Sequence, residues 1–141
     1  MEHEVWLVND DPAQLMVQKR LLSKVVPQVR DFLSPLEALS AARETESAPY
    51  LVTDFQMPMM DGPELARQWY SLFPQTRILI VSASEVSRDD QRRVDALPAD
   101  SVRLLTSYRI ADLPGKAKLW FFSLDEQLRI VADEETDKKV R

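Results

Sequence analysis

The chain has 141 residues, of which 45% are hydrophobic and 29% are charged, and its formal net charge is −5. This length suits a single domain with one core, and the acidic balance argues against nucleic-acid binding, which needs a basic surface. The absence of cysteine excludes disulfides, thiolate metal sites and cysteine nucleophiles. We therefore expect a cytoplasmic protein that does not bind nucleic acid.

Several other site types are also excluded. No apolar run approaches the ~20 residues of a membrane span, and the first ten residues lack the features of a signal peptide. Gly62 and Gly115, the two glycines of the chain, cannot form a glycine-rich nucleotide-binding loop. The single histidine, His3, argues against a histidine-based triad or metal centre.

Five short apolar runs predict five β-strands, at residues 5–8, 29–33, 50–52, 78–81 and 102–105. The first, third and fourth runs are nearly continuous, as in parallel strands that are buried on both faces. The second run alternates between apolar and polar residues and suits an edge strand.

Segments with helical periodicity separate these runs. Apolar stripes include Leu15 with Leu22, Leu36 with Leu39, Leu65 with Trp69, and a long one from Leu113 to Val131. Residues 86–97 have few apolar residues and predict a weakly anchored helix, while Asp112 is a candidate N-cap for the last helix. Alternating strands and helices predict a doubly wound parallel sheet, with one domain over residues 1–132 and a charged tail over residues 133–141.

Polar residues follow three of the predicted strands. Asn9, Asp10 and Asp11 follow the first, Asp54 ends the third, and Ser82 follows the fourth. In doubly wound sheets, ligands bind outside the carboxyl ends of the strands. Carboxylate and amide oxygens suit Mg²⁺, and a carboxylate beside a divalent cation can act as a nucleophile toward a phosphoryl group.

Simpler interpretations exist for some of these residues. Asp11 before Pro12 is an ordinary helix start, and Ser82 and Ser84 fit helix caps equally well. A purely structural role is harder to argue for Asp54, because a lone acid at the end of a buried strand is costly unless it is paired or functional.

The segment from Asp54 to Gly62, DFQMPMMDG, resembles the signature of response-regulator receivers. That signature has an acceptor aspartate, a proline four residues later and an aspartate-glycine pair that ends eight residues later. Residues 7–12 and 80–83 match the flanking receiver motifs, and the resemblance spans roughly residues 4–131. It implies a flavodoxin-like fold of five βα units with strand order 2-1-3-4-5.

The resemblance also implies a role for each candidate site residue. Asp54 corresponds to the phosphorylated aspartate, Asp10 and Asp54 to carboxylate ligands of Mg²⁺, and Gln56 to a ligand through its main-chain carbonyl. Ser82 corresponds to the hydroxyl that bonds the phosphoryl group and acts as a switch. Asn9 replaces a second acid, and we expect it to bind Mg²⁺ weakly or through water.

The fifth predicted strand departs from the receiver pattern. Leu105 or Thr106 stands where receivers have a lysine that pairs with the phosphate, and Val102 or Arg103 replaces an aromatic switch residue. Loss of a charge-assisted hydrogen bond of about 1.5–3 kcal/mol weakens switching about ten- to a hundred-fold. Arg103 and Arg109 are candidate replacements for the lysine.

We therefore expect a non-enzymatic receiver that takes a phosphoryl group from a histidine kinase or phosphotransfer protein, with Mg²⁺ as cofactor. It would signal by contact with a downstream protein and carry no output domain. The alternative is a pseudo-receiver, a scaffold that does not use phosphate, and a third possibility is a hydrolase that uses Asp10 and Asp54. Helical geometry places Leu119, Phe122 and Ile130 on the outer side of the last helix, either as a homodimer or partner contact or as ordinary surface residues.

Overall fold

The computed structural model describes residues 4–122 and contains the predicted parallel sheet. Its five strands are ordered β2-β1-β3-β4-β5, and every neighbouring pair is parallel. The strands are β1 (Val5–Val8), β2 (Val29–Phe32), β3 (Tyr50–Asp54), β4 (Ile78–Val81) and β5 (Val102–Leu105). The predicted fold class, strand order and edge position of β2 are thereby confirmed.

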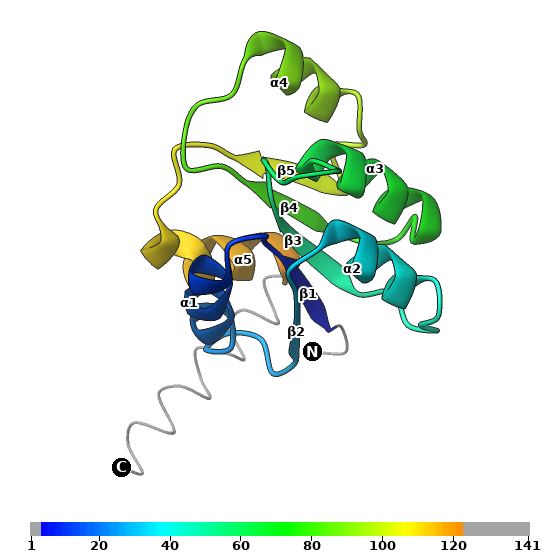
Figure 1. Ribbon diagram of the computed structural model, residues 1–141, viewed down its shortest axis with the longest axis vertical. Helices are drawn as coiled ribbons and strands as arrows, with labels where there is room; N and C mark the ends of the chain where they lie inside the picture. Colours follow the sequence, from blue (N-terminus) through cyan, green and yellow to red (C-terminus); the bar gives the residue numbers. More distant parts are fainter. Residues whose placement is uncertain (1–3, 123–141) are drawn as a thin grey trace.

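Five helices connect and cover the strands. They are α1 (Pro12–Leu22), α2 (Pro35–Ala42), α3 (Gly62–Leu72), α4 (Arg88–Asp95) and α5 (Leu113–Phe121), and a short 3₁₀ turn, η1 (Ile110–Asp112), precedes α5. Figure 1 shows α1 and α5 on one face of the sheet and α2 and α3 on the other. The sheet is therefore covered on both faces, as its apolar strands require.

The strand residues alternate between two apolar layers. In β1, Val5 and Leu7 pack with Leu22 and Leu113 under α1 and α5. Trp6 packs on the opposite face in the layer that contains α2 and α3, where its ring lies 5.5 Å from that of Trp69. This twofold alternation follows from strand geometry and gives each helix pair its own core layer.

Side-chain caps define where several helices begin. Asp11 accepts from the amides of Ala13 and Gln14 at 3.0 and 3.3 Å, so the helix-start interpretation of this residue is confirmed. Ser87 caps α4, which makes the cap interpretation of Ser82 and Ser84 wrong.

Asp112 precedes α5 as expected, but it makes no side-chain capping bond. The physical reason is that η1 runs directly into the helix, so Asp112 already has helical backbone angles (φ −81°, ψ −11°).

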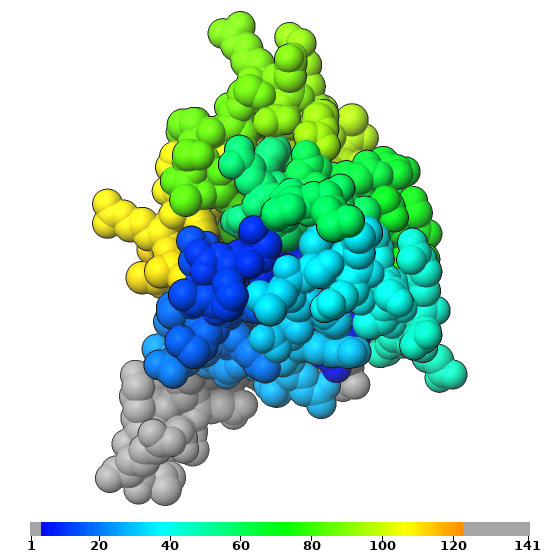
Figure 2. Space-filling model, in the orientation of Figure 1, coloured from blue at the N-terminus to red at the C-terminus, as the bar shows by residue number. Residues whose placement is uncertain are grey.

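Helix α4 is weakly anchored, as its sequence predicts. Within α4, all of which the structure describes, Val94 is the one buried residue. The helix projects from the body of the molecule at the top of Figures 1 and 2. Polar contacts must therefore supply much of what holds α4 in place.

The prediction that Phe122 faces outward is wrong. Its side chain is only 2% exposed, because α5 ends at Phe121 and Phe122 has extended backbone angles (φ −113°, ψ 145°). A helical projection therefore no longer applies to it. Leu119 is 62% exposed as expected, whereas Ile130, the predicted helix end at Val131 and the domain boundary at 132 lie outside the described residues. No helix within residues 4–122 is long and apolar enough to span a membrane.

Gly62 is the first residue of α3, and Gly115 in α5 serves as its control in a test of close packing. A Cβ atom on Gly62 would lie 2.6 Å from the carbonyl oxygen of Asp54, whereas one on Gly115 would meet nothing within 4 Å. Gly62→Ala should therefore lower the free energy of unfolding by about 1–3 kcal/mol. Gly115→Ala should raise it by up to about 1 kcal/mol. Urea unfolding of both variants checks this, and equal effects would contradict the close packing at Gly62.

Candidate functional site

The carboxyl ends of β1, β3 and β4 bring the predicted site residues to one edge of the sheet. Strand β3 lies between the other two, with Thr53 in register with Val8 and Asp54 in register with Val81. Asp54 is therefore central, while Asn9 and Asp10 follow β1 on one side and Ser82 follows β4 on the other. This is the edge at which doubly wound sheets bind ligands.

Asp54 carries a perturbed carboxyl group. Burial is the main factor that raises its pKa from 3.8 to about 6, and the negative charges of Asp10 and Asp11 raise it further. None of the ion pairs formed by residues 4–122 includes these three acids. Among residues 4–122, the site thus concentrates negative charge that no ion pair neutralises.

This donor set fits Mg²⁺ in its chemistry. Asp10 is exposed and Asp54 is half-buried, and their mutual repulsion is what a divalent cation would relieve. Residues 4–122 contain no group of three or more acidic, histidine or cysteine side chains that could enclose a metal. Mg²⁺ does not need one, because it retains several waters and commonly uses one or two carboxylates. Gln56, whose main-chain carbonyl is the third predicted ligand, lies two residues beyond Asp54 and is exposed.

Asn9 is buried, with 1% of its surface exposed. Both the oxygen and the nitrogen of its side-chain amide form hydrogen bonds. Its Oδ1 accepts from the main-chain N–H of Asp11 at 2.9 Å. Its Nδ2 donates to Oε1 of Gln18 at 3.0 Å and to Oε1 of Gln14 at 3.3 Å. Asn9 therefore supports the loop between β1 and α1, and its contact with a metal stays a prediction.

Ser82 is nearly buried, and its hydroxyl bonds its own loop. Its Oγ donates to the carbonyl of Ser84 at 2.8 Å. The main chain of Ser82 is held by the carbonyl of Leu105 at 2.8 Å and by the amide of Tyr108 at 3.1 Å. The hydroxyl would have to rotate away from Ser84 to bond an anion at Asp54.

Packing distinguishes the two residues that could stand in place of the family lysine. Leu105 packs against the core layer under α1 and α5, which leaves Thr106, the first residue after β5, at the strand end. Arg103 does not replace the lysine, because its guanidinium lies 4.4 Å from the ring of Trp120. That ring bonds the carbonyl of Ile78 at the opposite end of the sheet. Arg109 is exposed and forms no ion pair within residues 4–122.

Two residues that the sequence analysis did not assign to the site lie beside it. Gln18 is 1% exposed and its Nε2 donates to the hydroxyl oxygen of Tyr108 at 2.9 Å. Burial raises the pKa of Tyr108, and the charge of Asp54 adds to the rise although the Gln18 bond opposes it. A signal for Gln18 was present in the sequence, because it lies on the buried stripe of α1 with Leu15 and Leu22. A polar residue on an apolar stripe indicates a buried polar partner.

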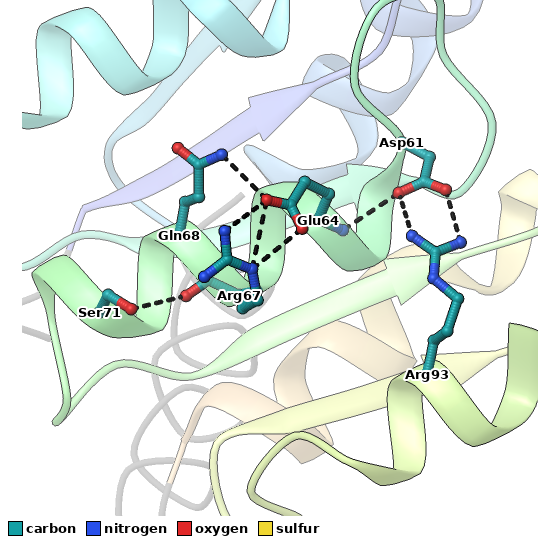
Figure 3. Close-up of polar contacts among 6 residues, drawn as sticks. All are labelled: Asp61, Glu64, Arg67, Gln68, Ser71 and Arg93. Carbon is teal, nitrogen blue, oxygen red and sulfur yellow. Dashed lines mark hydrogen bonds and ion pairs between the residues drawn. The ribbon is translucent and has the colours of Figure 1, made fainter.

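The loop that follows Asp54 is connected to α4. Asp61 caps α3 by accepting from the amide of Glu64 at 3.1 Å, and it also accepts two bonds from the guanidinium of Arg93, at 2.7 and 2.8 Å. Figure 3 shows this paired contact between the start of α3 and α4. Although burial opposes it, the Arg93 hydrogen bonds and the Glu64 amide hold the pKa of Asp61 below its ordinary value. Asp61 thus joins α4 to the loop beside the candidate acceptor.

A pH-dependent stability test follows from the raised pKa of Asp54. Asp54→Asn removes the charge that burial disfavours, so it should raise the free energy of unfolding. A rise in pKa from 3.8 to about 6 corresponds to about 3 kcal/mol, which solvent screening of a half-exposed group reduces to about 1–2 kcal/mol.

The sign of this effect depends on pH in a defined way. The folded-state pKa is raised, so the penalty is fully present above about pH 6 and disappears as the pH falls below 3.8. Urea unfolding at about pH 7 and about pH 4 should show a much larger gain at the higher pH. The exposed Asp100→Asn serves as control, and a gain that is equal at both pH values would contradict the burial argument.

The Asp61–Arg93 contact is tested by local rather than global stability. Arg93→Gln should change the free energy of unfolding by less than about 1 kcal/mol, because both partners are partly exposed. It should nevertheless speed amide hydrogen exchange in α4. Arg92→Gln is the matched control, since Arg92 pairs within α4 with Asp89. Equal exchange in the two variants would show that the contact does not hold α4.

Comparisons with known proteins agree with this architecture. A family model described as "Response regulator receiver domain" matches residues 5–106. No curated protein matches the chain. The structure of the chemotaxis protein CheY4 from Vibrio cholerae is similar, with a TM-score of 0.70, 20% identity and coverage of 86% of this chain and 100% of that one.

Two further structures are similar in the same way. A CheY-like receiver domain protein from Methanospirillum hungatei JF-1 has a TM-score of 0.71 and 24% identity, with 90% and 97% of the two chains covered. The signal receiver domain of an HD domain-containing protein from Pseudomonas fluorescens Pf-5 has a TM-score of 0.68 and 16% identity, with 94% and 92% covered. At these identities the structures establish the fold, and the family model establishes membership: the chain belongs to the response regulator receiver domain family of two-component signalling.

Proposed function

We propose that Asp54 of this receiver accepts a phosphoryl group from the phosphohistidine of a histidine kinase or phosphotransfer protein. Receiver domains in general are signalling modules that interact with such partners and typically bind Mg²⁺ at the phosphorylation site. The observation that carries the proposal is the central position of Asp54 at the carboxyl edge, half-buried and beside Asp10, with neither acid in an ion pair within residues 4–122.

The chemistry of transfer is a simple exchange of bonds. A carboxylate oxygen of Asp54 forms a bond to phosphorus while the bond from phosphorus to the histidine nitrogen breaks. The histidine keeps the electron pair of that bond and takes up a proton. Asp10, Asp54 and the main-chain carbonyl of Gln56 are the proposed ligands of Mg²⁺, which when bound supplies positive charge beside the phosphoryl oxygens.

Ser82 is the proposed contact that changes after transfer. Its hydroxyl bonds the carbonyl of Ser84, and an anionic phosphoryl oxygen is a stronger acceptor than a neutral carbonyl. Rotation of this hydroxyl would release the loop between β4 and α4. Helix α4 is in turn held to the acceptor loop by Asp61 and Arg93, so a change at Asp54 reaches α4 from two sides.

The incoming partner has an apolar residue available beside the acceptor. Met59, five residues after Asp54, is 87% exposed and has a positive φ of 72°. Non-glycine residues rarely adopt this conformation, and methionine adapts readily to different partner surfaces. These features support recognition of a protein partner by the loop between β3 and α3.

Phosphorylation is tested by intact-mass spectrometry after incubation with acetyl phosphate and Mg²⁺. The parent protein should gain one phosphoryl group, and Asp54→Asn should gain none. The exposed Asp95→Asn on α4 should behave like the parent, which controls for loss of a carboxylate elsewhere. Chelation of Mg²⁺ should abolish the adduct.

An absence of adduct on the folded parent would redirect the proposal. If a panel of histidine phosphotransfer proteins also fails to transfer phosphate, the chain is a phosphorylation-independent pseudo-receiver. An adduct that persists in Asp54→Asn would instead place the acceptor at another residue.

A further inference from the structure

Asn9, one of the departures from the receiver pattern, begins a chain of hydrogen bonds that leads to the loop after β5, where the receiver lysine is missing. Asn9 donates to Gln18 at 3.0 Å, and Gln18 donates to the hydroxyl oxygen of Tyr108 at 2.9 Å. Asn9 and Gln18 are each 1% exposed. The chain runs from the end of β1, through the middle of α1, to the loop between β5 and α5.

The direction of this chain is fixed by a main-chain donor. The N–H of Asp11 can only donate, and it bonds Oδ1 of Asn9 at 2.9 Å. The NH₂ group of Asn9 must therefore face Gln18, whose oxygen accepts it. The NH₂ group of Gln18 then faces Tyr108, so the phenol oxygen accepts and its own proton remains available for donation. A carboxylate in place of Asn9 could not donate, and the chain would lose its direction.

Tyr108 lies between the two strands that flank the acceptor. The main-chain amide of Tyr108 bonds the carbonyl of Ser82 at 3.1 Å, which attaches it to the end of β4. Its side chain reaches Gln18, which is bonded to the end of β1. Asp54 ends β3, the strand between β1 and β4. The tyrosine thus bridges the two strands that flank the acceptor, and the charge of Asp54 is close enough to affect its hydroxyl.

We infer that Tyr108 donates a hydrogen bond to the phosphoryl group on Asp54, in the role that a lysine fills in other receivers, and that Gln18 is its positioning residue. This inference rests on the proposed function. A phenol is neutral, so its bond to the phosphoryl group is weaker than that of a lysine. It should contribute about five- to tenfold in affinity for a phosphoryl group, as a typical hydrogen bond does.

Binding of beryllofluoride, a phosphoryl analogue, separates this role from a structural one. Fluorine NMR titration at saturating Mg²⁺ gives its affinity, and a separate titration gives the affinity for Mg²⁺ alone. Tyr108→Phe should weaken beryllofluoride about five- to tenfold and leave Mg²⁺ unchanged. Gln18→Met, which keeps the volume but removes the amide, should have a smaller effect in the same direction. Tyr70→Phe, on α3, is the matched control and should match the parent.

Restoring the lysine provides a second test. Thr106→Lys placed in the Tyr108→Phe protein should recover the lost affinity, because it returns a donor to the position after β5. It should also recover the Gln18→Met protein, so the inference stays testable if Tyr108→Phe does not fold.

The possible outcomes are distinguishable. Equal beryllofluoride affinity in the parent and Tyr108→Phe would overturn the inference and leave the proposed function intact. Parallel loss of Mg²⁺ and beryllofluoride affinity would also overturn it, because Tyr108 would then only maintain the fold. A parent protein that binds no beryllofluoride and gains no phosphoryl group would overturn both the inference and the proposed function.

Discussion

A carboxylate held partly out of water at the end of β3 is the constraint on which the rest of the site depends. Desolvation raises the pKa of Asp54, and two neighbouring acids raise it further. Such an arrangement costs stability unless a cation or a covalent partner offsets it. The surrounding loops are correspondingly tight: the amide of Gly62 bonds the carbonyl of Phe55 at 2.7 Å, and a side chain on Gly62 would collide with Asp54. The fold therefore fixes the acceptor in position at the expense of stability.

The two departures from the receiver pattern at this edge cancel each other in formal charge. Asparagine at position 9 removes one negative charge relative to an acid, and the missing lysine removes one positive charge. The net charge beside Asp54 is therefore the same as with both charged residues present. Asn9 and Thr106 are neutral instead, and Asn9 is joined through Gln18 to Tyr108. Buried polar groups are costly when they lack partners, so the side chain at position 9 must suit its contact with Gln18.

The sequence predicted most of the fold because strand and helix periodicities are local signals. It placed Asp10, Asp54 and Ser82 at one edge because the parallel topology requires that. Contacts between distant segments were not accessible: Gln18 and Tyr108 are 90 residues apart, and Asp61 and Arg93 are 32 apart. Phe122 was placed wrongly because periodicity does not reveal where a helix ends. Ser82 was open between two roles because a hydroxyl can cap a helix or bond an anion with equal ease.

Helix α4 combines weak burial with a direct connection to the acceptor loop. Its one buried side chain, Val94, contributes little apolar area compared with those of the fully described α3. Arg93 of this helix forms an ion pair with Asp61, which lies in the loop that follows Asp54. Elements that move during signalling come from the less stable parts of a fold, because a strongly packed element cannot shift at low cost. Coupling between sites also requires an element with two arrangements that both sites can bias. Of the helices in residues 4–122, α4 meets the first condition best, since it buries one residue and the others bury three or more, and its bond to Asp61 gives it a direct contact with the acceptor loop.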